Sequence, residues 1–180
     1  MYQCAGDLSL GATERLVPAI ASAGAGVIEL GVPFSDPIAD GPAILAASQR
    51  ALAAGTSLPK LLDLVARLRA SGLSTPLVPM GYANPLVAMG WERFAQRAAR
   101  AGVDGAIVPD LPLEEAEPVS AVLGAAGLDF VLLAAPTTPP ERLARIAERT
   151  RGFLHFVSVT GVTGARAQLP EELPAMHRST

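Results

Sequence analysis

The chain has 180 residues, of which 50% are hydrophobic and 17% are charged, and its 14 basic and 17 acidic residues give a formal net charge of −3. This apolar content is enough for one buried core, so a single domain over residues 1–180 is expected and disorder is excluded. The basic residues are scattered, which excludes the phosphate-neutralising surface of a nucleic-acid-binding protein.

Neither a membrane segment nor a disulfide is predicted. The longest uncharged stretch, residues 70–91, contains three prolines and three glycines, which argue against a membrane-spanning helix. The single cysteine, Cys4, cannot form a disulfide within the chain, and the first residues lack the pattern of an export signal. We therefore expect a cytoplasmic protein that does not bind a membrane.

Six strands are expected along the chain, the first of them near residue 1. The other five are short runs of apolar and β-branched residues, which are typical of strands buried in a parallel sheet. They are Val27–Gly31, Leu77–Gly81, Gly105–Val108, Phe130–Leu133 and Phe153–Val157.

Longer segments rich in Ala, Leu, Arg and Glu separate these strands and have the spacing of helices. They are Leu10–Ala23, Pro42–Ala54, Leu58–Ser71, Trp91–Ala101, Glu114–Ala126 and Pro140–Thr150. Gly24, Gly102 and Gly127 follow three of them, as expected where a helix ends in a left-handed residue. The chain is thus predicted to contain six units of roughly 30 residues, the size of a βα crossover unit.

Alternating strands and helices suit either an open doubly wound sheet or a closed (β/α)8 barrel. A doubly wound nucleotide-binding fold ordinarily has a glycine-rich phosphate turn after its first strand, and residues 4–9 lack one. Polar residues follow several different strands instead, as in barrels whose loops build one site at the carboxyl ends of the strands. We therefore predict a TIM barrel, of which this chain holds about six of the eight βα units.

Glu29 lies inside one of the apolar predicted strands. An ionised carboxylate is costly in such a place, and its pKa should rise towards neutrality unless it has a strong partner. A carboxyl group of this kind suits a general acid or base. The alternative interpretation is structural: the side chain points out of the sheet and pairs with an arginine.

Asp36 and Asp40 lie in the loop after this strand, where three prolines restrict the backbone and Gly41 permits the turn into the next helix. Both are candidates for function, and both have the alternative role of capping the helix or closing a turn. Asp7 and Asp110 also follow strands and face the same choice.

Three further segments carry weaker signals. The segment Val159–Ala165 combines two glycines with the hydroxyl groups of two threonines and so leaves backbone amides free to approach a phosphate, although such a sequence is more often only a turn. His155 stands among apolar residues, where a barrel-lining histidine is more common than a catalytic one. Tyr82 and Asn84 are candidates for ligand contact, but Asn84-Pro85 also predicts a turn. No second histidine or cysteine lies at ligand spacing, so no metal site is predicted.

Taken together, the motifs resemble one family, the α subunit of tryptophan synthase. The longest match is the run Glu29–Pro37 with Ala39–Pro42. Further matches follow the family's order over nearly the whole chain: Ala5–Asp7, Met80 with Tyr82, Asn84 and Pro85, Val108–Pro112, Ala135–Pro139 and Ser158–Gly164.

The resemblance implies a (β/α)8 barrel that cleaves indole-3-glycerol phosphate into indole and glyceraldehyde 3-phosphate, with no metal or organic cofactor of its own. Glu29 matches the family's general acid/base, and Asp40 matches its second catalytic carboxylate, which holds the indole N–H. Thr163 and Gly164 match the mobile loop over the site, with Gly164 at the phosphate end, and His155 matches a substrate contact.

The resemblance also implies a partner, the tryptophan synthase β subunit, which carries pyridoxal phosphate and receives indole within an α2β2 complex. Pro33 and Asp36, in the loop after the second strand, and Asn84, after the third, match segments that face this partner.

The sequence departs from the family's pattern at Leu8, where proline is usual, at Gly81, where threonine is expected, and at His155, which lies in a pair that commonly includes tyrosine. The chain is also expected to start at strand one and to stop at Thr180, before the strands whose loops form most of the phosphate cradle. Two hypotheses follow. The chain is a lyase subunit of tryptophan biosynthesis, or it is a truncated, catalytically weak α-like chain that only binds or modulates the β subunit. An unrelated phosphate-binding barrel enzyme is a distant third.

Overall fold

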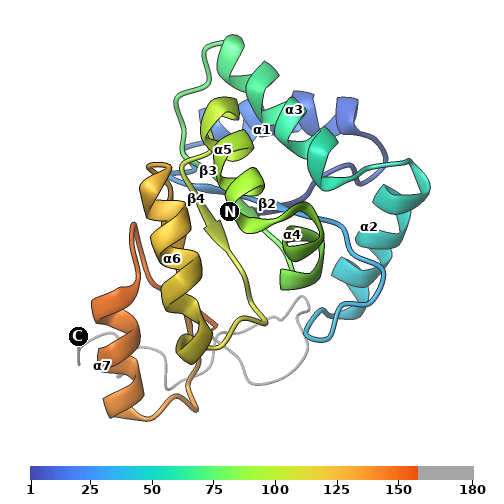
Figure 1. The fold of residues 1–180 in the computed structure, drawn as a ribbon. Helices are drawn as coiled ribbons and strands as arrows, with labels where there is room; N and C mark the ends of the chain where they lie inside the picture. Colours follow the sequence, from blue (N-terminus) through green and yellow to red (C-terminus); the bar gives the residue numbers. More distant parts are fainter. Residues whose placement is uncertain (158–180) are drawn as a thin grey trace.

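The computed structural model describes residues 1–157 as an alternation of parallel strands and helices (Figure 1). The strands are β1 (Tyr2–Cys4), β2 (Ile28–Gly31), β3 (Leu77–Met80), β4 (Gly105–Ile107), β5 (Asp129–Val131), β6 (Leu133–Ala134) and β7 (His155–Phe156). The helices are α1 (Leu10–Ser22), α2 (Pro42–Ala53), α3 (Leu58–Ala70), α4 (Ala83–Met89), α5 (Trp91–Ala101), η1 (Leu113–Glu115, a 3-10 turn), α6 (Ala116–Ala125) and α7 (Pro140–Arg149).

The strands pair in parallel and in chain order. β1 to β5 form one sheet in the order β1-β2-β3-β4-β5, and β6 pairs with β7. Only Leu132 separates β5 from β6. Backbone hydrogen bonds from Arg151 N–H to Phe130 O and from His155 N–H to Leu132 O, both 3.0 Å long, place the approach to β7 alongside both pieces. β5 and β6 are therefore one interrupted strand. Residues 1–157 thus contain six strands in barrel order, without the reversal of order that defines a doubly wound sheet.

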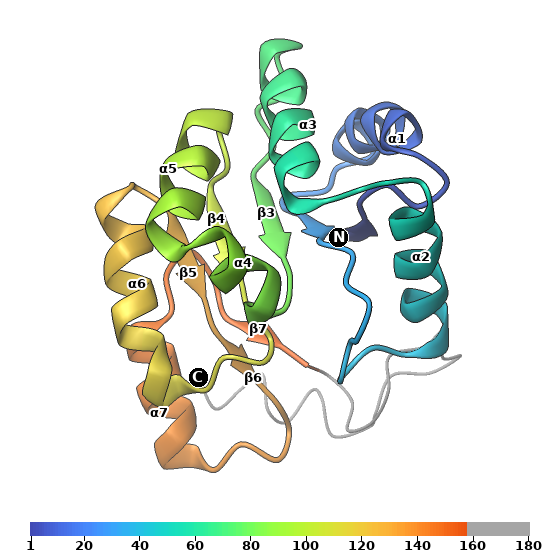
Figure 2. The ribbon, with the colours of Figure 1, turned by 45° about the vertical axis from the view of Figure 1, so that its right-hand side comes forward.

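The helices α1, α3, α5 and α6 cover one face of this sheet, each packed against the next (Figure 2). Between these helices and the strands lies the main hydrophobic core, which includes Leu30 from β2, Leu64 from α3 and Phe94 from α5, all with no exposed surface. Burial of large side chains of this kind stabilises the fold by about 1.5 to 3 kcal/mol each.

The other face of the sheet carries a smaller hydrophobic cluster that contains Val78, Ile107 and Val131. In a barrel this face is the interior. The strand register assigns side chains to it, because Glu29 is opposite Val78, and Ile107 is opposite Val131. Side chains alternate along a strand, so Leu30 points to the helices whereas its neighbour Glu29 points to the interior.

The predicted strands and the six predicted helices are confirmed, with ends that shift by a few residues. The predicted glycine ends are confirmed as well. Gly24, Gly102 and Gly127 have φ of 97°, 85° and 78°, in the left-handed region that glycine adopts without steric cost.

The predicted turn at Asn84-Pro85 is wrong, because helix α4 occupies these residues. Pro85 is tolerated there since it lies in the first turn, where a missing N–H costs no hydrogen bond within the helix. The first amide of the helix, Ala83 N–H, donates to Oδ1 of Asp110 at 2.8 Å. Gly90, with φ of 88°, ends α4 and immediately precedes α5.

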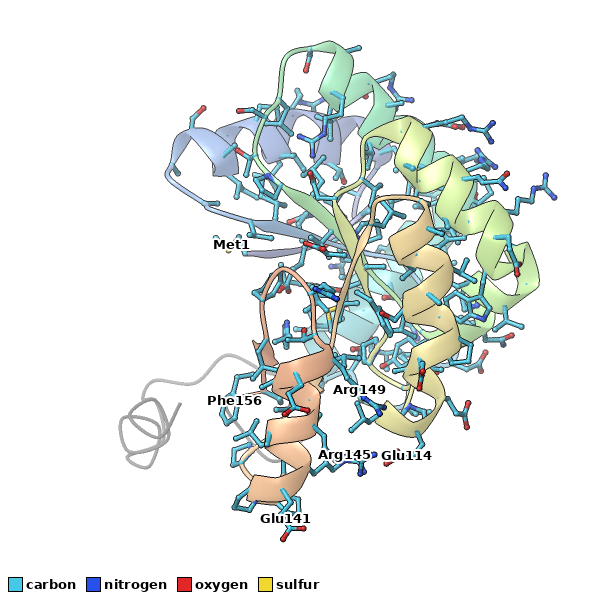
Figure 3. The ribbon with its side chains drawn as sticks, turned by 60° about the vertical axis from the view of Figure 1, so that its left-hand side comes forward. Met1, Glu114, Glu141, Arg145, Arg149 and Phe156 are labelled. Carbon is cyan, nitrogen blue, oxygen red and sulfur yellow. The ribbon has the colours of Figure 1, made fainter. Side chains whose placement is uncertain are left out.

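The helix α7 is linked to η1 by an ion pair. Arg142 donates to both carboxylate oxygens of Glu114, at 2.7 and 2.9 Å, and this contact lowers the pKa of Glu114 to about 2. Figure 3 shows Glu141, Arg145 and Arg149 projecting from α7, where all three are exposed, so the outer side of this helix is strongly charged. Among the described residues, no helix combines the length and the apolar character needed to cross a membrane.

Candidate active site

Glu29 is the acidic residue that β2 presents to the interior of the barrel. Its backbone is held from both sides: its N–H donates to the carbonyl of Met1 at 2.8 Å, and the register places it between Tyr2 on β1 and Val78 on β3. The residue is only 9% exposed. A carboxylate buried to this degree needs a hydrogen-bonding partner to remain ionised.

His155 on β7 provides that partner. Its Nδ1 lies 3.1 Å from Oε1 of Glu29, so the imidazole and the carboxyl group share a hydrogen bond across the interior. Burial by itself would raise the pKa of Glu29, but the hydrogen bond and charge of His155, together with the amino group of Met1, outweigh burial. The pKa of Glu29 therefore lies below its ordinary value, and the group is held ionised.

These contacts decide between the interpretations of Glu29. The structural alternative, an outward side chain paired with an arginine, is wrong. The expected rise in its pKa depended on the lack of a strong partner and does not occur. The barrel-lining position expected for His155 is confirmed. His155 is in register with Leu133 of the interior cluster, whereas its neighbours Leu154 and Phe156 pack against the main core.

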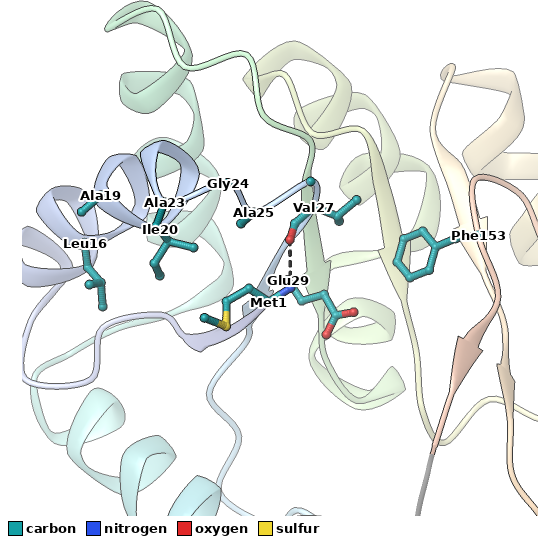
Figure 4. A pocket seen from close by; sticks show the side chains of 11 residues that line it. Met1, Leu16, Ala19, Ile20, Ala23, Gly24, Ala25, Val27, Glu29 and Phe153 are labelled. Atoms are coloured by element: carbon teal, nitrogen blue, oxygen red, sulfur yellow. Dashed lines mark hydrogen bonds between the residues drawn. The ribbon is translucent and has the colours of Figure 1, made fainter. Parts of the chain in front are cut away.

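A cavity of about 620 Å³ opens beside Glu29 (Figure 4). Apart from Glu29, its lining consists of glycine and apolar residues from the start of the chain, from α1, from the turn before β2 and from Phe153. The amino group of Met1 donates to the carbonyl of Val27 at 2.9 Å at its edge. Of the two candidate carboxyl groups, Glu29 lines this cavity and Asp40 does not.

Asp40 lies half-buried near the end of the loop that connects β2 to α2. Burial raises the pKa of Asp40 above its ordinary value, and a hydrogen bond from the Tyr82 hydroxyl acts in the opposite direction without cancelling it. The helix-capping alternative is wrong for both aspartates of this loop, because the N-cap of α2 is Gly41 and no side-chain hydrogen bond caps this helix.

Tyr82 also supports the loop itself. Its hydroxyl oxygen accepts a hydrogen bond from Ala39 N–H at 3.1 Å, and its ring lies against that of Phe34, with centroids 5.6 Å apart. One buried side chain from the end of β3 therefore fixes the loop at two places and contacts the carboxyl group of Asp40. Sequence reasoning named Tyr82 only as a candidate ligand contact. Its supporting role depends on a contact between distant parts of the chain.

Tyr2 is the site residue that the sequence analysis missed. It is opposite Glu29 in the sheet, and its hydroxyl lies so close to Gly31 that any side chain at position 31 would collide with it. Burial raises the pKa of Tyr2, as do nearby groups that include Asp40 and Glu29, so the hydroxyl remains protonated at neutral pH. Tyr2 thus lies within electrostatic reach of both carboxyl groups. Knowledge of the β1-β2 register was the only signal that would have identified it.

The remaining loop residues have different surroundings. Asp36 and Asn84 are exposed, and Asp36 accepts a hydrogen bond from the hydroxyl of Ser35. Pro33, in the same loop as Asp36, is buried. Asp7 has a structural role, because Arg50 on α2 donates to both of its carboxylate oxygens, at 2.7 and 3.0 Å.

Two of the predicted site residues, Thr163 and Gly164, lie outside the described residues, and their positions remain predictions. Within residues 1–157, no group of three or more His, Cys, Asp or Glu side chains is placed to hold a metal ion.

The fold and the site define a class of protein: a parallel βα barrel chain whose polar residues come from strands and from the loops that follow them. Comparison with known families identifies the class more closely. The sequence pattern of the family described as "Tryptophan synthase alpha chain" matches residues 1–179, and the chain belongs to this family.

Individual relatives agree with this assignment. The tryptophan synthase alpha chain of Synechococcus sp. (strain CC9902) is 53% identical over 168 residues, which are 93% of this chain and 62% of the relative. That of Geobacter sulfurreducens is 54% identical over 163 residues, which are 91% of this chain and 61% of the relative. The chain thus spans about three fifths of the length of these curated relatives.

Solved structures support the fold. A tryptophan synthase alpha chain from Legionella pneumophila superposes with a TM-score of 0.87 at 40% identity, covering 99% of this chain and 64% of the other. A chain from a structure of the tryptophan synthase α2β2 complex of Pyrococcus furiosus gives a TM-score of 0.90 at 41% identity, covering 98% of this chain and 71% of that chain. The predicted TIM barrel is therefore confirmed, with six of its strands in the described residues.

Proposed function

We propose that this chain acts in tryptophan biosynthesis as the α subunit of tryptophan synthase, a carbon–carbon lyase that cleaves indole-3-glycerol phosphate into indole and glyceraldehyde 3-phosphate. One observation carries the proposal: in a chain of this family, a buried carboxylate, Glu29, is held by His155, and Asp40 follows on the next loop. Tyr2 is in register with Glu29, and the charges of both Asp40 and Glu29 raise the pKa of its hydroxyl, which supports one site for the two carboxyl groups.

Glu29 is the proposed general acid/base. In this cleavage the glycerol hydroxyl beside the indole ring loses its proton as its oxygen becomes the aldehyde oxygen. The carbon–carbon bond to indole C3 breaks, and C3 gains a proton. One proton is released and one is taken up, so a single carboxyl group that accepts the first and supplies the second balances the reaction.

Asp40 is the proposed partner of the indole N–H. Positive charge develops on the ring nitrogen as C3 gains its proton, and breakage of the carbon–carbon bond returns an electron pair to the ring. A fixed carboxylate beside the nitrogen stabilises that charge. Burial disfavours the ionised form of Asp40 in the free protein. An N–H donor that becomes more positive in the transition state favours that form, so the interaction strengthens as the reaction proceeds.

The substrate contacts and partner belong to the same proposal. Thr163, Gly164 and His155 are proposed to contact the substrate, with Gly164 near its phosphate, and no cofactor is proposed on this chain. The proposed partner is the β subunit, which would carry pyridoxal phosphate, in an α2β2 complex such as the one solved from Pyrococcus furiosus. Asp36 and Asn84 are exposed and so are available to face it, whereas buried Pro33 would shape the loop. A cytoplasmic location is also proposed.

The competing hypothesis is a catalytically weak chain that only binds or modulates the β subunit. The relatives do not favour it, because chains 53% and 54% identical to this one are named tryptophan synthase alpha chains. The presence of both candidate carboxyl groups in this sequence also favours a catalyst.

The test is indole release from indole-3-glycerol phosphate. Because the relatives are longer, we would use an extended chain, in which this sequence is fused to the carboxyl-terminal segment of the Synechococcus relative that follows the matched region. The intact Synechococcus chain is the positive control. Indole formation by the extended chain, and its stimulation by a β subunit, are the expected results. A folded extended chain that binds the β subunit but releases no indole would instead support the competing hypothesis.

A further inference from the structure

Within residues 1–157, His155 and Glu29 form the one contact in which a basic side chain reaches a candidate catalytic group from across the barrel. Building on the proposed function, we propose that His155 is a positioning residue, which holds the Glu29 carboxylate in its ionised, proton-accepting form. This role is additional to the substrate contact proposed above for the same residue, because it acts on Glu29 and not on the substrate.

The geometry favours a role directed at Glu29. β7 is not a sheet neighbour of β2, so the hydrogen bond of 3.1 Å links strands that face one another across the interior. Both side chains are largely shielded from water, with exposed fractions of 23% for His155 and 12% for Glu29. A hydrogen bond involving a charged group is stronger in such surroundings than in water.

The other groups that face Glu29 do not replace this contact. On β1, Tyr2 is opposite Glu29, and its raised pKa keeps its hydroxyl neutral. The amino group of Met1 adds positive charge near Glu29, but it donates its hydrogen bond to the carbonyl of Val27. From β3, the opposite residue is the apolar Val78. Among residues 1–157, His155 is therefore the side chain that hydrogen-bonds the Glu29 carboxyl group.

Removal of the imidazole has a consequence of definite sign. Burial is the largest single influence on Glu29, and it raises the pKa. Without the donor this influence is unopposed except by Met1, so the pKa of Glu29 rises and the ionised form requires a higher pH. Since the ionised form accepts the proton of the glycerol hydroxyl, activity at low pH is lost first.

Two substitutions of the same residue separate the hydrogen bond from the charge. His155→Phe removes the donor and keeps a ring. His155→Asn keeps an N–H donor near the position of Nδ1 but never carries a charge, so it should restore part of the effect. Phe156→Leu is the matched control, because Phe156 lies on the same strand but packs towards the main core.

Two measurements on the extended chain read out the effect. The first is the pH profile of kcat/KM for indole release. In His155→Phe, the acid limb of this profile should move to higher pH, and a move of one pH unit lowers kcat/KM at a fixed pH on that limb about tenfold. The second is an NMR titration of 13C-labelled glutamate carboxyl groups, in which Glu29→Gln identifies the signal of Glu29. That signal should titrate at higher pH in His155→Phe, at an intermediate pH in His155→Asn, and unchanged in Phe156→Leu.

The outcomes are distinct. If His155→Phe raises KM while the pH profile and the Glu29 titration stay unchanged, His155 acts only as a substrate contact and the inference is overturned. If Phe156→Leu shifts the titration as much as His155→Phe, the effect is general packing, which also overturns it. Because the NMR titration requires no turnover, an inactive extended chain would contradict the proposed function alone and leave this test in place.

Discussion

The strand β2 and the loop that follows it each carry one of the two candidate carboxyl groups. The pKa values of these two groups shift in opposite directions. Glu29 is fixed within a parallel sheet and meets an imidazole from the far side of the barrel, and its pKa is lowered. Asp40 lies in a loop supported by Tyr82 from the adjacent strand, and its pKa is raised.

The difference shows that burial alone does not set the ionisation of a carboxyl group in this site. The more deeply buried of the two, Glu29, is the one with the lowered pKa, because its partner can carry positive charge. The hydroxyl of Tyr82 offers Asp40 a neutral donor, which is too weak to offset burial. The candidate site thus contains one carboxyl group that is kept ionised, Glu29, and one whose ionisation is opposed by burial, Asp40. This difference suits two different roles.

Glu29→Gln should have the largest effect on activity. Glutamine keeps the shape and still accepts a hydrogen bond from His155, but it cannot exchange a proton. In the extended chain we expect kcat to fall by about 10²- to 10⁴-fold with little change in KM. Steady-state indole release and calorimetric substrate binding measure the two quantities. A kcat close to that of the unmodified chain would remove Glu29 from the mechanism.

Asp40→Asn should follow, with a loss in kcat of about 10²- to 10³-fold, because an amide offers no negative charge to the ring nitrogen. The matched control is Asp36→Asn, in the same loop but exposed. It should change cleavage by the isolated extended chain less than about tenfold and should affect stimulation by a β subunit more. A larger loss in the isolated reaction for Asp36→Asn than for Asp40→Asn would reverse the assignment of the two aspartates.

Tyr82→Phe tests whether the loop depends on its support. The substitution removes the hydroxyl that contacts Ala39 N–H and Asp40, while the ring contact with Phe34 is retained. A hydrogen bond contributes about 0.5 to 1.5 kcal/mol, so kcat/KM should fall by up to about tenfold for each bond lost. Tyr2→Phe is the comparison, since no hydrogen bond of the Tyr2 hydroxyl is found within residues 1–157, and its loss should be smaller. Equal losses would mean that the Tyr82 bonds do not position Asp40.

Much of the fold was predictable because the features that determine it are local. Alternating apolar runs and helical segments predicted the strands and six of the helices, and single glycines such as Gly24 marked helix ends. The error at α4 has a local cause as well. Asn84-Pro85 is a common turn sequence, but proline also fits the first turn of a helix, and the bond from Ala83 to Asp110 that fixes the start of this helix joins separate segments.

The site was less predictable, because its properties arise from contacts between distant segments. The sequence showed that Glu29 was an unusual residue in a strand. Its partner was not predictable, since the bond to His155 spans 126 positions. The contribution of Tyr2 depends on strand register, and a shift of one residue would have turned its side chain to the other face. Residue types indicated the chemistry, whereas the sign of each pKa shift required the fold.

The smallest expected effect is on stability, and it should have opposite signs at the two carboxyl groups. A lowered pKa means that ionised Glu29 stabilises the folded state, fully above its unfolded-state pKa, and that this contribution is lost as the pH falls through the folded-state value. A raised pKa means that ionised Asp40 destabilises the folded state at neutral pH, and that this cost is relieved as the pH falls.

Glu29→Gln should therefore lower the free energy of unfolding near neutral pH, whereas Asp40→Asn should raise it while reducing activity. Both differences should shrink in acid, and Asp36→Asn should change little at either pH. Urea unfolding of the extended chain and its three variants at about pH 7 and about pH 4 measures these differences. If Glu29→Gln and Asp40→Asn change the free energy of unfolding in the same direction at neutral pH, the two carboxyl groups do not differ in how their ionisation affects stability.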